Sequence, residues 1–462
     1  AVLPVVSNKR RLNKRRSRKL MQLPGSPVRR LLANMLRQAL ASTHAGRALQ
    51  RSLRTDGGHL TIGRRRYDLR DYERIVVVGA GKASAAMARA IEPILGRHLE
   101  GGLVIVKYGH GLPTKRIAVT EAGHPLPDRA GLAAARRMMK LVAGLSERDL
   151  LFVLLSGGAS SLMPSPVDGV TLTDKQRVTD QLLRSGASIA EINAVRKHLS
   201  NLKGGRLAAM SDATIVTLIL SDVIGDDLSA VGSGPTAPDP TTYREAVTCL
   251  RRYGLWSSAP RSVRRHLTNG LDGRLTETSK PGAMLFRRVH HEIIGNNATA
   301  LAALTTSARA AGWRTELLPP ITKEARAAAA DFGALAKRIL ARQRPRHRPY
   351  CVIAGGETIV NVRGNGKGGR TQEFALAAAK AVAGLSGVFV AAVATDGTDG
   401  PTDAAGGLVS GETWNRAKRI GLDLEAALTR NDSYRVLKRL NCHIVTGPTE
   451  TNVNDLYLLF IF

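Results

Sequence analysis

The sequence has little cysteine. Cys249, Cys351 and Cys442 are the three cysteines among 462 residues, and no two of them form a CxxC pair. Such spacing provides neither a disulfide framework nor a zinc knuckle, so a reducing compartment is the expected environment. Aromatic residues are also scarce, at 4%. Because no basic segment alternates with aromatic residues, nothing indicates a stacking surface for nucleic acid, and we expect no nucleic-acid partner.

Long apolar runs are missing as well. No uninterrupted run approaches the roughly 20 apolar residues that a bilayer-spanning helix needs, so we expect no membrane partner. The composition, with 43% hydrophobic and 23% charged residues, is that of a globular protein. At about 150 residues per domain, the length predicts two or three domains, and two if they are large α/β units.

Acidic residues are absent from the first 55 positions, which carry 14 Lys and Arg residues. This stretch holds nearly half of the formal net charge of +31. Its most basic part, residues 8–19, is typical of a solvated extension, an organellar transit peptide or a nucleic-acid-binding arm. We expect residues 1–28 to be a disordered extension of a cytoplasmic protein. A mitochondrial location is the alternative if they form a transit peptide.

Apolar segments typical of strands alternate with helical segments after this extension. Helices are predicted over 28–53, 83–91 and 130–145, and strands over 74–78, 103–106, 150–155 and 215–220. The strand segments are apolar throughout, which indicates parallel strands covered on both faces. We therefore predict a doubly wound α/β domain over 29–285.

A second α/β unit is predicted over 286–462. Its strands are expected at 289–294, 350–354, 389–394 and 456–462, and its helices at 298–311 and 323–342. The charged segment 342–349 is predicted to be an exposed connection.

Polar loops follow nearly every predicted strand. They are Gly79-Ala-Gly-Lys82, Ser156-Gly-Gly-Ala-Ser-Ser161, Ser221-Asp-Val-Ile-Gly-Asp-Asp227, Gly355-Gly-Glu-Thr358 and the segment 395–403. In open α/β sheets, ligands bind at the carboxyl ends of strands, where loop amides and helix N-termini converge. These strand ends are therefore the expected binding site.

The first of these loops matches no familiar phosphate motif completely. Val76 and Ala83 stand where a Walker A loop requires Gly and Ser or Thr, and the next strand ends in Lys107 where a dinucleotide site requires an acid. Its glycines are explained equally by close packing of helix and strand. Lys82 is more informative, because an ammonium group at a helix N-terminus adds to the positive potential there and so indicates a bound anion.

Carboxylates collect in two of the other loops. The first group is Asp222, Asp226 and Asp227, and the second is Asp396, Asp399 and Asp403. Both groups suit Mg²⁺ bound together with phosphate, since Mg²⁺ commonly takes one or two carboxylates plus substrate oxygens. Solvated or helix-capping carboxylates are the alternative.

Cations are expected to complete the site. Arg370 follows a glycine-rich loop and could grip phosphate or carboxylate with its planar fork. A cationic pocket for a small anionic substrate is expected from Lys82, Arg196, Lys197, Lys203 and Arg370. His124 and His198 are candidate bases, with a structural role as the alternative for each.

Taken together, these segments resemble the glycerate 2-kinases, whose second domain is the MOFRL domain, here about residues 350–456. The matching segments include Val78-Gly-Ala-Gly-Lys-Ala83, Gly123-His-Pro-Leu-Pro-Asp128, Asn193-Ala-Val-Arg-Lys-His-Leu-Ser200 and Gly368-Gly-Arg-Thr-Gln-Glu-Phe374. The resemblance covers about residue 29 to the end. It implies a first, Rossmann-like domain with a mostly parallel sheet, a smaller α/β MOFRL-type domain, and an active site in the cleft between them. It also implies ATP-dependent phosphorylation of D-glycerate at its 2-hydroxyl, with Mg²⁺.

Lys82 and Arg370 match the positions that the family uses as catalytic cations. Substrate or phosphate binding is expected from Gly79, Gly81, Ser156, Gly157, Gly158, Ser160, Arg196, Lys203 and Glu357, and metal binding from Asp222, Asp226, Asp396 and Asp399. The family commonly has Asn where Thr371 stands and Gly where Glu450 stands. Glu450 is unfavourable if its position requires a positive φ. The alternative activity is NAD(P)H-dependent hydroxypyruvate reduction, which rests on Gly79-Ala-Gly81 alone. For the oligomeric state, a homodimer is considered as well as a monomer.

Overall fold

The computed structural model describes residues 27–342 and 349–462, which form two units. The N-terminal unit comprises Thr43–Asn296 together with Glu450–Asn452. The C-terminal unit comprises residues 27–42, Asn297–Thr449 and Val453–Phe462. Residues 1–26 of the predicted extension and 343–348 of the predicted connection lie outside the described residues.

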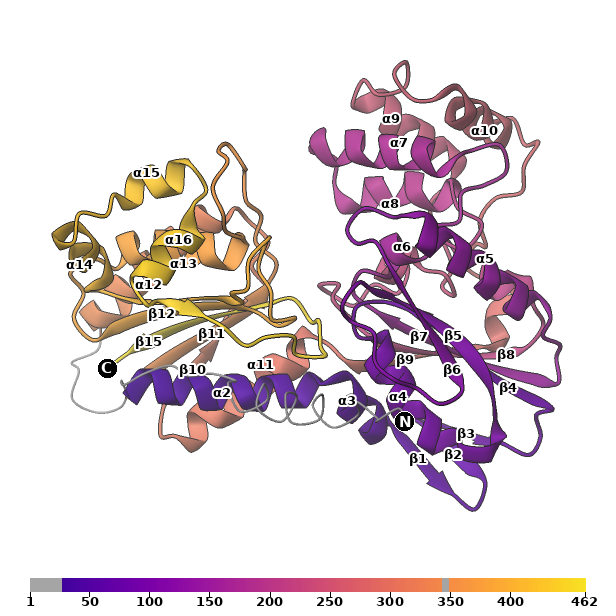
Figure 1. The fold of residues 1–462 in the computed structure, drawn as a ribbon, viewed down its shortest axis with the longest axis horizontal. Helices are drawn as coiled ribbons and strands as arrows, with labels where there is room; N and C mark the ends of the chain where they lie inside the picture. The colour runs from indigo at the N-terminus through magenta and orange to yellow at the C-terminus, as the bar shows by residue number, and fades with distance from the viewer. Residues whose placement is uncertain (1–26, 343–348) are drawn as a thin grey trace, which may run out of the picture. The chain divides into compact units, whose positions relative to one another are not determined.

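A six-stranded parallel sheet forms the centre of the N-terminal unit (Figure 1). Its strands are β4 (Arg74–Ala80), β5 (Leu99–Lys107), β6 (Ile117–Ala122), β7 (Asp149–Ser156), β8 (Thr214–Leu220) and β9 (Val289–Gly295). They lie in the order β6-β5-β4-β7-β8-β9, the 3-2-1-4-5-6 order of doubly wound dinucleotide folds. The strand order reverses between β4 and β7, so the ends of these two strands are the expected ligand site.

Helices and a small sheet complete this unit. They are α3 (Ala45–Ser52), the antiparallel strands β1 (Leu53–Asp56), β2 (His59–Ile62) and β3 (Arg65–Asp68), and the helices α4 (Ser84–Leu95), α5 (Arg129–Ala143) and α6 (Ala159–Leu162). Four further helices, α7 (Leu172–Arg184), α8 (Ile189–His198), α9 (Tyr243–Arg252) and α10 (Arg261–Leu271), pack on one another in a separate layer (Figure 1). A Ser188–Glu191 capping box fixes the start of α8.

The C-terminal unit holds a mixed sheet. Its strands lie in the order β10 (Arg314–Leu317), β11 (Tyr350–Gly356), β15 (Asp455–Ile461), β12 (Val388–Ala394), β13 (Gly406–Ser410) and β14 (His443–Ile444). The last long strand of the chain, β15, lies antiparallel between β11 and β12. The helices are α2 (Pro27–Thr43), α11 (Asn297–Ala310), α12 (Ala325–Arg342), α13 (Arg370–Ala381), α14 (Thr413–Arg419), α15 (Leu424–Thr429) and α16 (Ser433–Arg439). In the core of this unit, Phe332 packs edge-to-face on Phe374, and Phe374 packs at a tilt against Tyr457.

The predicted α/β class and the main strands and helices are confirmed, but the predicted boundary at residue 285 differs from the structure. Residues 289–294, predicted to open the second unit, form β9 and pair in parallel with β8 at the edge of the first sheet. A long segment that contains helices α9 and α10 separates the two strands in sequence, so local sequence patterns do not reveal that they pair. Residues 29–42, predicted to belong to the first domain, form most of α2 and group with the C-terminal unit.

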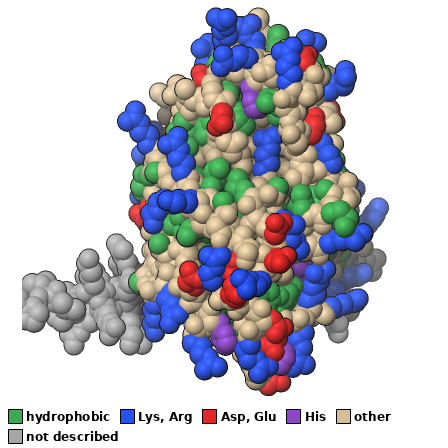
Figure 2. All heavy atoms as spheres, turned by 90° about the vertical axis from the view of Figure 1, so that its right-hand side faces the viewer, with side chains coloured by type: hydrophobic (Ala, Val, Ile, Leu, Met, Phe, Trp, Pro, Cys, Tyr) green, Lys and Arg blue, Asp and Glu red, His purple; other side chains and the backbone are tan. Residues whose placement is uncertain are grey.

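Charge is mixed on the face of the molecule in Figure 2, where Lys and Arg side chains are scattered among apolar and acidic ones. No single basic stripe of the kind that binds a nucleic-acid backbone is visible on that face. Within residues 27–342 and 349–462, no helix has the length and apolar character needed to cross a bilayer.

Candidate functional site

Gly79 and Gly81 bring β4 into close contact with β7. A Cβ on Gly79 would lie 2.3 Å from the carbonyl oxygen of Leu154, and a Cβ on Gly81 would lie 2.1 Å from Ser156 Oγ. Gly81 also has a φ of +140°, which L side chains rarely adopt. Close contact with β7 therefore accounts for both glycines, whereas the alternative expected from the sequence was packing of helix against strand.

Lys82 lies two residues before Ser84, the first residue of α4, at the point where the strand order reverses. Its backbone N–H donates to the carbonyl of Gly157 at 2.9 Å, which ties the loop after β4 to the loop after β7. The next amide, of Ala83, donates to Ser156 Oγ at 3.0 Å, and Ser156 is fully buried. The Ser156 hydroxyl therefore supports the loop from inside, while Lys82 stands at the positive end of α4.

Gly157 and Gly158 leave room for three polar side chains. A Cβ on Gly157 would lie 2.2 Å from Asp222 Oδ2 and 1.8 Å from Asn452 Nδ2, and a Cβ on Gly158 would lie 2.9 Å from the His124 ring. Asn452 Nδ2 donates to Asp222 Oδ2 at 3.2 Å. The structure thus brings together the predicted Gly157, Gly158 and Asp222, and it adds Asn452, which the sequence analysis did not select.

The other predicted metal ligands accept hydrogen bonds within their own units. Asp226 accepts from Asn296 Nδ2, and Asp396 accepts from the Thr398 amide at 3.0 Å. Asp399 is buried and accepts from the Gln372 amide at 2.9 Å, which caps the start of α13. The part of the chain that the structure describes holds no group of three or more His, Cys, Asp or Glu side chains placed to bind a metal.

Arg370, the first residue of α13, is held by carboxylates. Its Nε donates to Asp455 Oδ2 at 2.6 Å and its Nη2 donates to Asp455 Oδ1 at 3.1 Å, and Glu357 pairs with Nη1. Asn454 and Tyr457 donate to the same two carboxylates. Burial raises the pKa of Asp455 to about 7, against the attraction of Arg370. The predicted Arg370 and Glu357 lie together, and Asp455 is a residue that the sequence reasoning missed.

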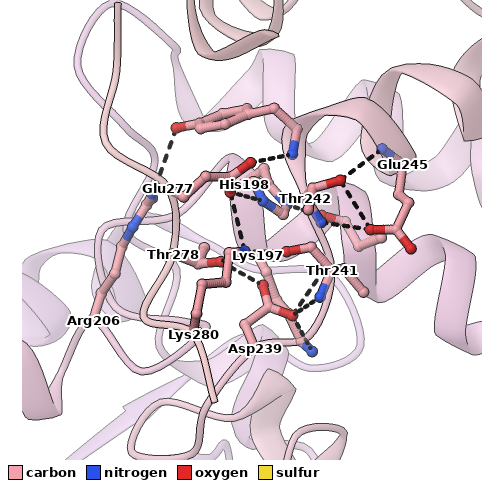
Figure 3. Close-up of polar contacts among 12 residues, drawn as sticks. Lys197, His198, Arg206, Asp239, Thr241, Thr242, Glu245, Glu277, Thr278 and Lys280 are labelled. Atoms are coloured by element: carbon pink, nitrogen blue, oxygen red, sulfur yellow. Dashed lines mark hydrogen bonds and ion pairs between the residues drawn. The ribbon is translucent and has the colours of Figure 1, made fainter. Parts of the chain in front are cut away.

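Lys197 and His198 belong to a buried structural network (Figure 3). Lys197 Nζ lies 3.1 Å from Asp239 Oδ1, and their side chains are 3% and 0% exposed. Both ring nitrogens of the fully buried His198 are occupied, Nδ1 by the carbonyl of Ala194 at 2.7 Å and Nε2 by Glu277 at 2.9 Å. This geometry corrects the expectations that Lys197 lines a ligand pocket and that His198 acts as a base.

Lys203 contacts Ser160, a residue of α6. Lys203 Nζ donates to the Ser160 carbonyl at 2.8 Å and to Ser160 Oγ at 3.0 Å, and Ser160 Oγ lies 2.9 Å from Ser233 Oγ. Ser160 is only two residues beyond Gly158. The binding residues expected from the segments around 157–160 and 203 are therefore adjacent in the structure.

The two positions that depart from the family pattern have different surroundings. Thr371 is fully buried, and its hydroxyl donates to the Ala405 carbonyl at 3.0 Å. Glu450 has a φ of +57°, in the left-handed region that favours glycine. Its carboxylate is held by Arg89 Nη2 at 2.9 Å and by His44 Nε2 at 3.3 Å.

Two family models match the chain: Domain of unknown function (DUF4147) over residues 31–268, and the MOFRL family over residues 350–455. A glycerate 2-kinase of Pyrococcus horikoshii is 38% identical over 436 residues, which cover 94% of this chain and 97% of the relative. A protein of Agrobacterium vitis provisionally named hydroxypyruvate reductase is 43% identical over 394 residues, 84% of this chain and 87% of the relative. The crystal structure of a glycerate kinase from Thermotoga maritima superposes with a TM-score of 0.80 at 39% identity, covering 94% of this chain and 99% of that one.

Proposed function

The chain belongs to the glycerate kinase family of phosphotransferases, and from this premise we propose that it transfers a phosphoryl group from ATP to the 2-hydroxyl of D-glycerate. The observation that carries the proposal is the near-complete match to a glycerate 2-kinase, 94% of this chain at 38% identity. Lys82 and the loop 157–158 stand at the point of the sheet where doubly wound folds bind phosphates.

The residues suit phosphoryl transfer, which asks mainly for positioning and for neutralisation of the charge that develops on the phosphoryl oxygens. In the N-terminal unit, Lys82 supplies a cation at the N-terminus of α4. In the C-terminal unit, Arg370 matches the other position that the family uses as a catalytic cation. Because Asp455 grips it with two hydrogen bonds, the Arg370 guanidinium is held in one orientation and is prepared to receive an oxygen without reorganising.

Magnesium is the expected metal, and Asp222 is the predicted ligand whose position fits it. Hard oxygen donors suit Mg²⁺, which often takes one or two protein carboxylates and completes its shell with phosphate and water. The Asp222 carboxylate and the Asn452 amide adjoin Gly157, where phosphate is expected. The bound ion would neutralise phosphate charge. Asp399 does not fit this role, since it is buried as the cap of α13.

A hydroxypyruvate reductase fits the residues less well. Strand packing explains Gly79 and Gly81, and β5 ends in Lys107 rather than in the acid that would bind a dinucleotide ribose.

The test is a ³¹P and ¹³C NMR analysis of the products formed from ATP, Mg²⁺ and D-glycerate. We expect 2-phosphoglycerate and ADP. The absence of turnover at saturating ATP would refute the proposal, and NADH oxidation with hydroxypyruvate would establish the reductase in its place. Formation of 3-phosphoglycerate would keep the reaction class and correct the position of transfer.

A further inference from the structure

Three cations of the N-terminal unit, Lys175 on α7, Arg196 on α8 and Lys203 beside α6, form a cluster without a counterion. Lys175 and Lys203 are 6% and 1% exposed. Among residues 27–342 and 349–462, no carboxylate forms an ion pair with any of the three. Lys175 Nζ lies 3.5 Å from the backbone carbonyl oxygen of Arg196. Burial lowers the pKa of both lysines, and repulsion from Arg196 lowers it further in each.

The partners of the two lysines are neutral oxygens. Lys203 donates to Ser160 and to the Gly232 carbonyl at 3.4 Å, and Lys175 donates to the Leu199 carbonyl at 2.9 Å. Carbonyl dipoles solvate an ammonium group but carry no net charge. The Arg196 guanidinium forms no hydrogen bond and no ion pair with any residue that the structure describes, although burial lowers its pKa.

Grouping buried cations without a negative charge is unfavourable, because each has lost water and repels the others. Proteins normally place a carboxylate in such a cluster, as this one does for the neighbouring Lys197. The missing charge therefore points to an anion that arrives from outside. Arg196 and Ser160 are both partly exposed, so the cluster is accessible at these two side chains.

Neutral groups at the cluster are already oriented. Asn193 stands one helical turn before Arg196 on the same face of α8, and its Oδ1 accepts from Ser233 Oγ at 3.1 Å. Ser233 Oγ also contacts Ser160 Oγ, which accepts from Lys203. This chain of contacts fixes the Ser160 hydroxyl, two residues from the loop proposed to receive phosphate.

We propose that Arg196, together with Lys203 and Ser160, binds the carboxylate of the hydroxy-acid substrate. The assignment deepens the proposed kinase function and rests on it. A carboxylate is favoured over phosphate because the guanidinium fork matches a carboxylate in two hydrogen bonds. Phosphate already has a site at Lys82 and residues 157–158. The site then selects acids over neutral polyols of the same size.

The experiment is steady-state kinetics of Arg196→Met with ATP, using D-glycerate and glycerol as acceptors. The matched control is Arg177→Met, an exposed arginine on α7 two residues from Lys175. Loss of a bidentate charged contact predicts a KM for D-glycerate raised about 10- to 100-fold. The KM for ATP and the slow reaction with glycerol should change less than about twofold. Arg177→Met should behave as the parent protein.

Other outcomes overturn the assignment. An unchanged KM for D-glycerate removes Arg196 from the carboxylate site, and a raised KM for ATP with an unchanged KM for D-glycerate makes the cluster a nucleotide-phosphate site instead. Calorimetric titration of the parent and Arg196→Met proteins with D-glycerate and D-lactate, without ATP, separates this proposal from the kinase function. If the parent protein lacks kinase activity but binds these acids through Arg196, only the kinase function fails. If the parent binds neither acid, or Arg196→Met binds them equally well, the carboxylate site fails.

Discussion

Arg196 and Lys197 are consecutive residues of α8, yet their charges have opposite surroundings. Lys197 is buried against Asp239, whose carboxylate also accepts from Thr241 and Thr278 (Figure 3). Arg196 lies near Lys175 and Lys203 and forms an ion pair with no carboxylate of residues 27–342 and 349–462. Because a helix turns by about 100° per residue, two adjacent side chains point to different regions. For these two neighbours, the charge that Asp239 neutralises belongs to the fold, and we assign the charge without a carboxylate partner to the site.

The largest effect is expected from Lys82→Met, which tests whether a cation at a helix N-terminus serves the ligand rather than the fold. We expect kcat with D-glycerate to fall at least about 100-fold, since a preorganised positive group at the phosphoryl oxygens is lost. The urea midpoint of unfolding should remain close to that of the parent protein. A fall in stability with kcat preserved would place Lys82 with Lys197, as part of the fold.

Asp239→Ala removes the carboxylate that pairs with Lys197. It leaves Lys197 buried without a counterion, so we expect the free energy of unfolding in urea to fall by about 3–5 kcal/mol. Lys203→Met is the matched change on the unpaired side and should cost clearly less, because it leaves no buried countercharge behind and removes hydrogen bonds only to neutral oxygens. Equal losses for the two variants would contradict the distinction between paired and unpaired cations.

Lys175 should make stability depend on pH. Burial lowers its pKa from 10.5 to about 7, with further repulsion from Arg196 and Arg206. Between these values the unfolded chain binds a proton that the folded protein does not, so stability should rise with pH from about 7 to 10.5. The slope from this group is at most about 1.4 kcal/mol per pH unit. Lys175→Met should remove this contribution in urea titrations across that range, and an unchanged slope would mean that Lys175 keeps its proton.

The smallest effect is expected from Glu450→Gly, which tests a third class of charge, one paired at the surface. Glycine removes the conformational cost of a side chain at positive φ, about 1 kcal/mol. It also removes the partly exposed ion pairs with Arg89 and His44, which contribute at most about 1 kcal/mol. The free energy of unfolding should therefore stay within about 1 kcal/mol of the parent value. A loss of 3 kcal/mol would show that a surface pair can match the buried Lys197 pair.

Local patterns predicted much of this structure. The apolar runs located the central strands, and polar strand-end loops located Lys82, Gly157 and Asp222, because the carboxyl ends of parallel strands converge on one edge of a sheet. Patterns could not assign β9 to the first sheet, since its partner β8 lies far away in sequence.

The roles of individual charges were harder to predict. Arg196 and Lys197 are adjacent basic residues of one segment, and the sequence does not show which of them is paired. The position of Asp239 in the structure distinguishes them. Lys175 and Asp455 were missed for the same reason, because burial beside particular neighbours makes them unusual. Such surroundings are a property of the tertiary structure.

The most direct test compares Arg196→Met with Lys197→Met by thermal unfolding, each with and without saturating D-glycerate. Without the acid, Lys197→Met should unfold at a clearly lower temperature than the parent protein, and Arg196→Met should not. Addition of D-glycerate should raise the Tm of Lys197→Met, as of the parent, by mass action and raise that of Arg196→Met clearly less. If Arg196→Met is as unstable as Lys197→Met and is stabilised by D-glycerate as strongly as the parent, Arg196 belongs to the fold and the distinction between the two residues is wrong.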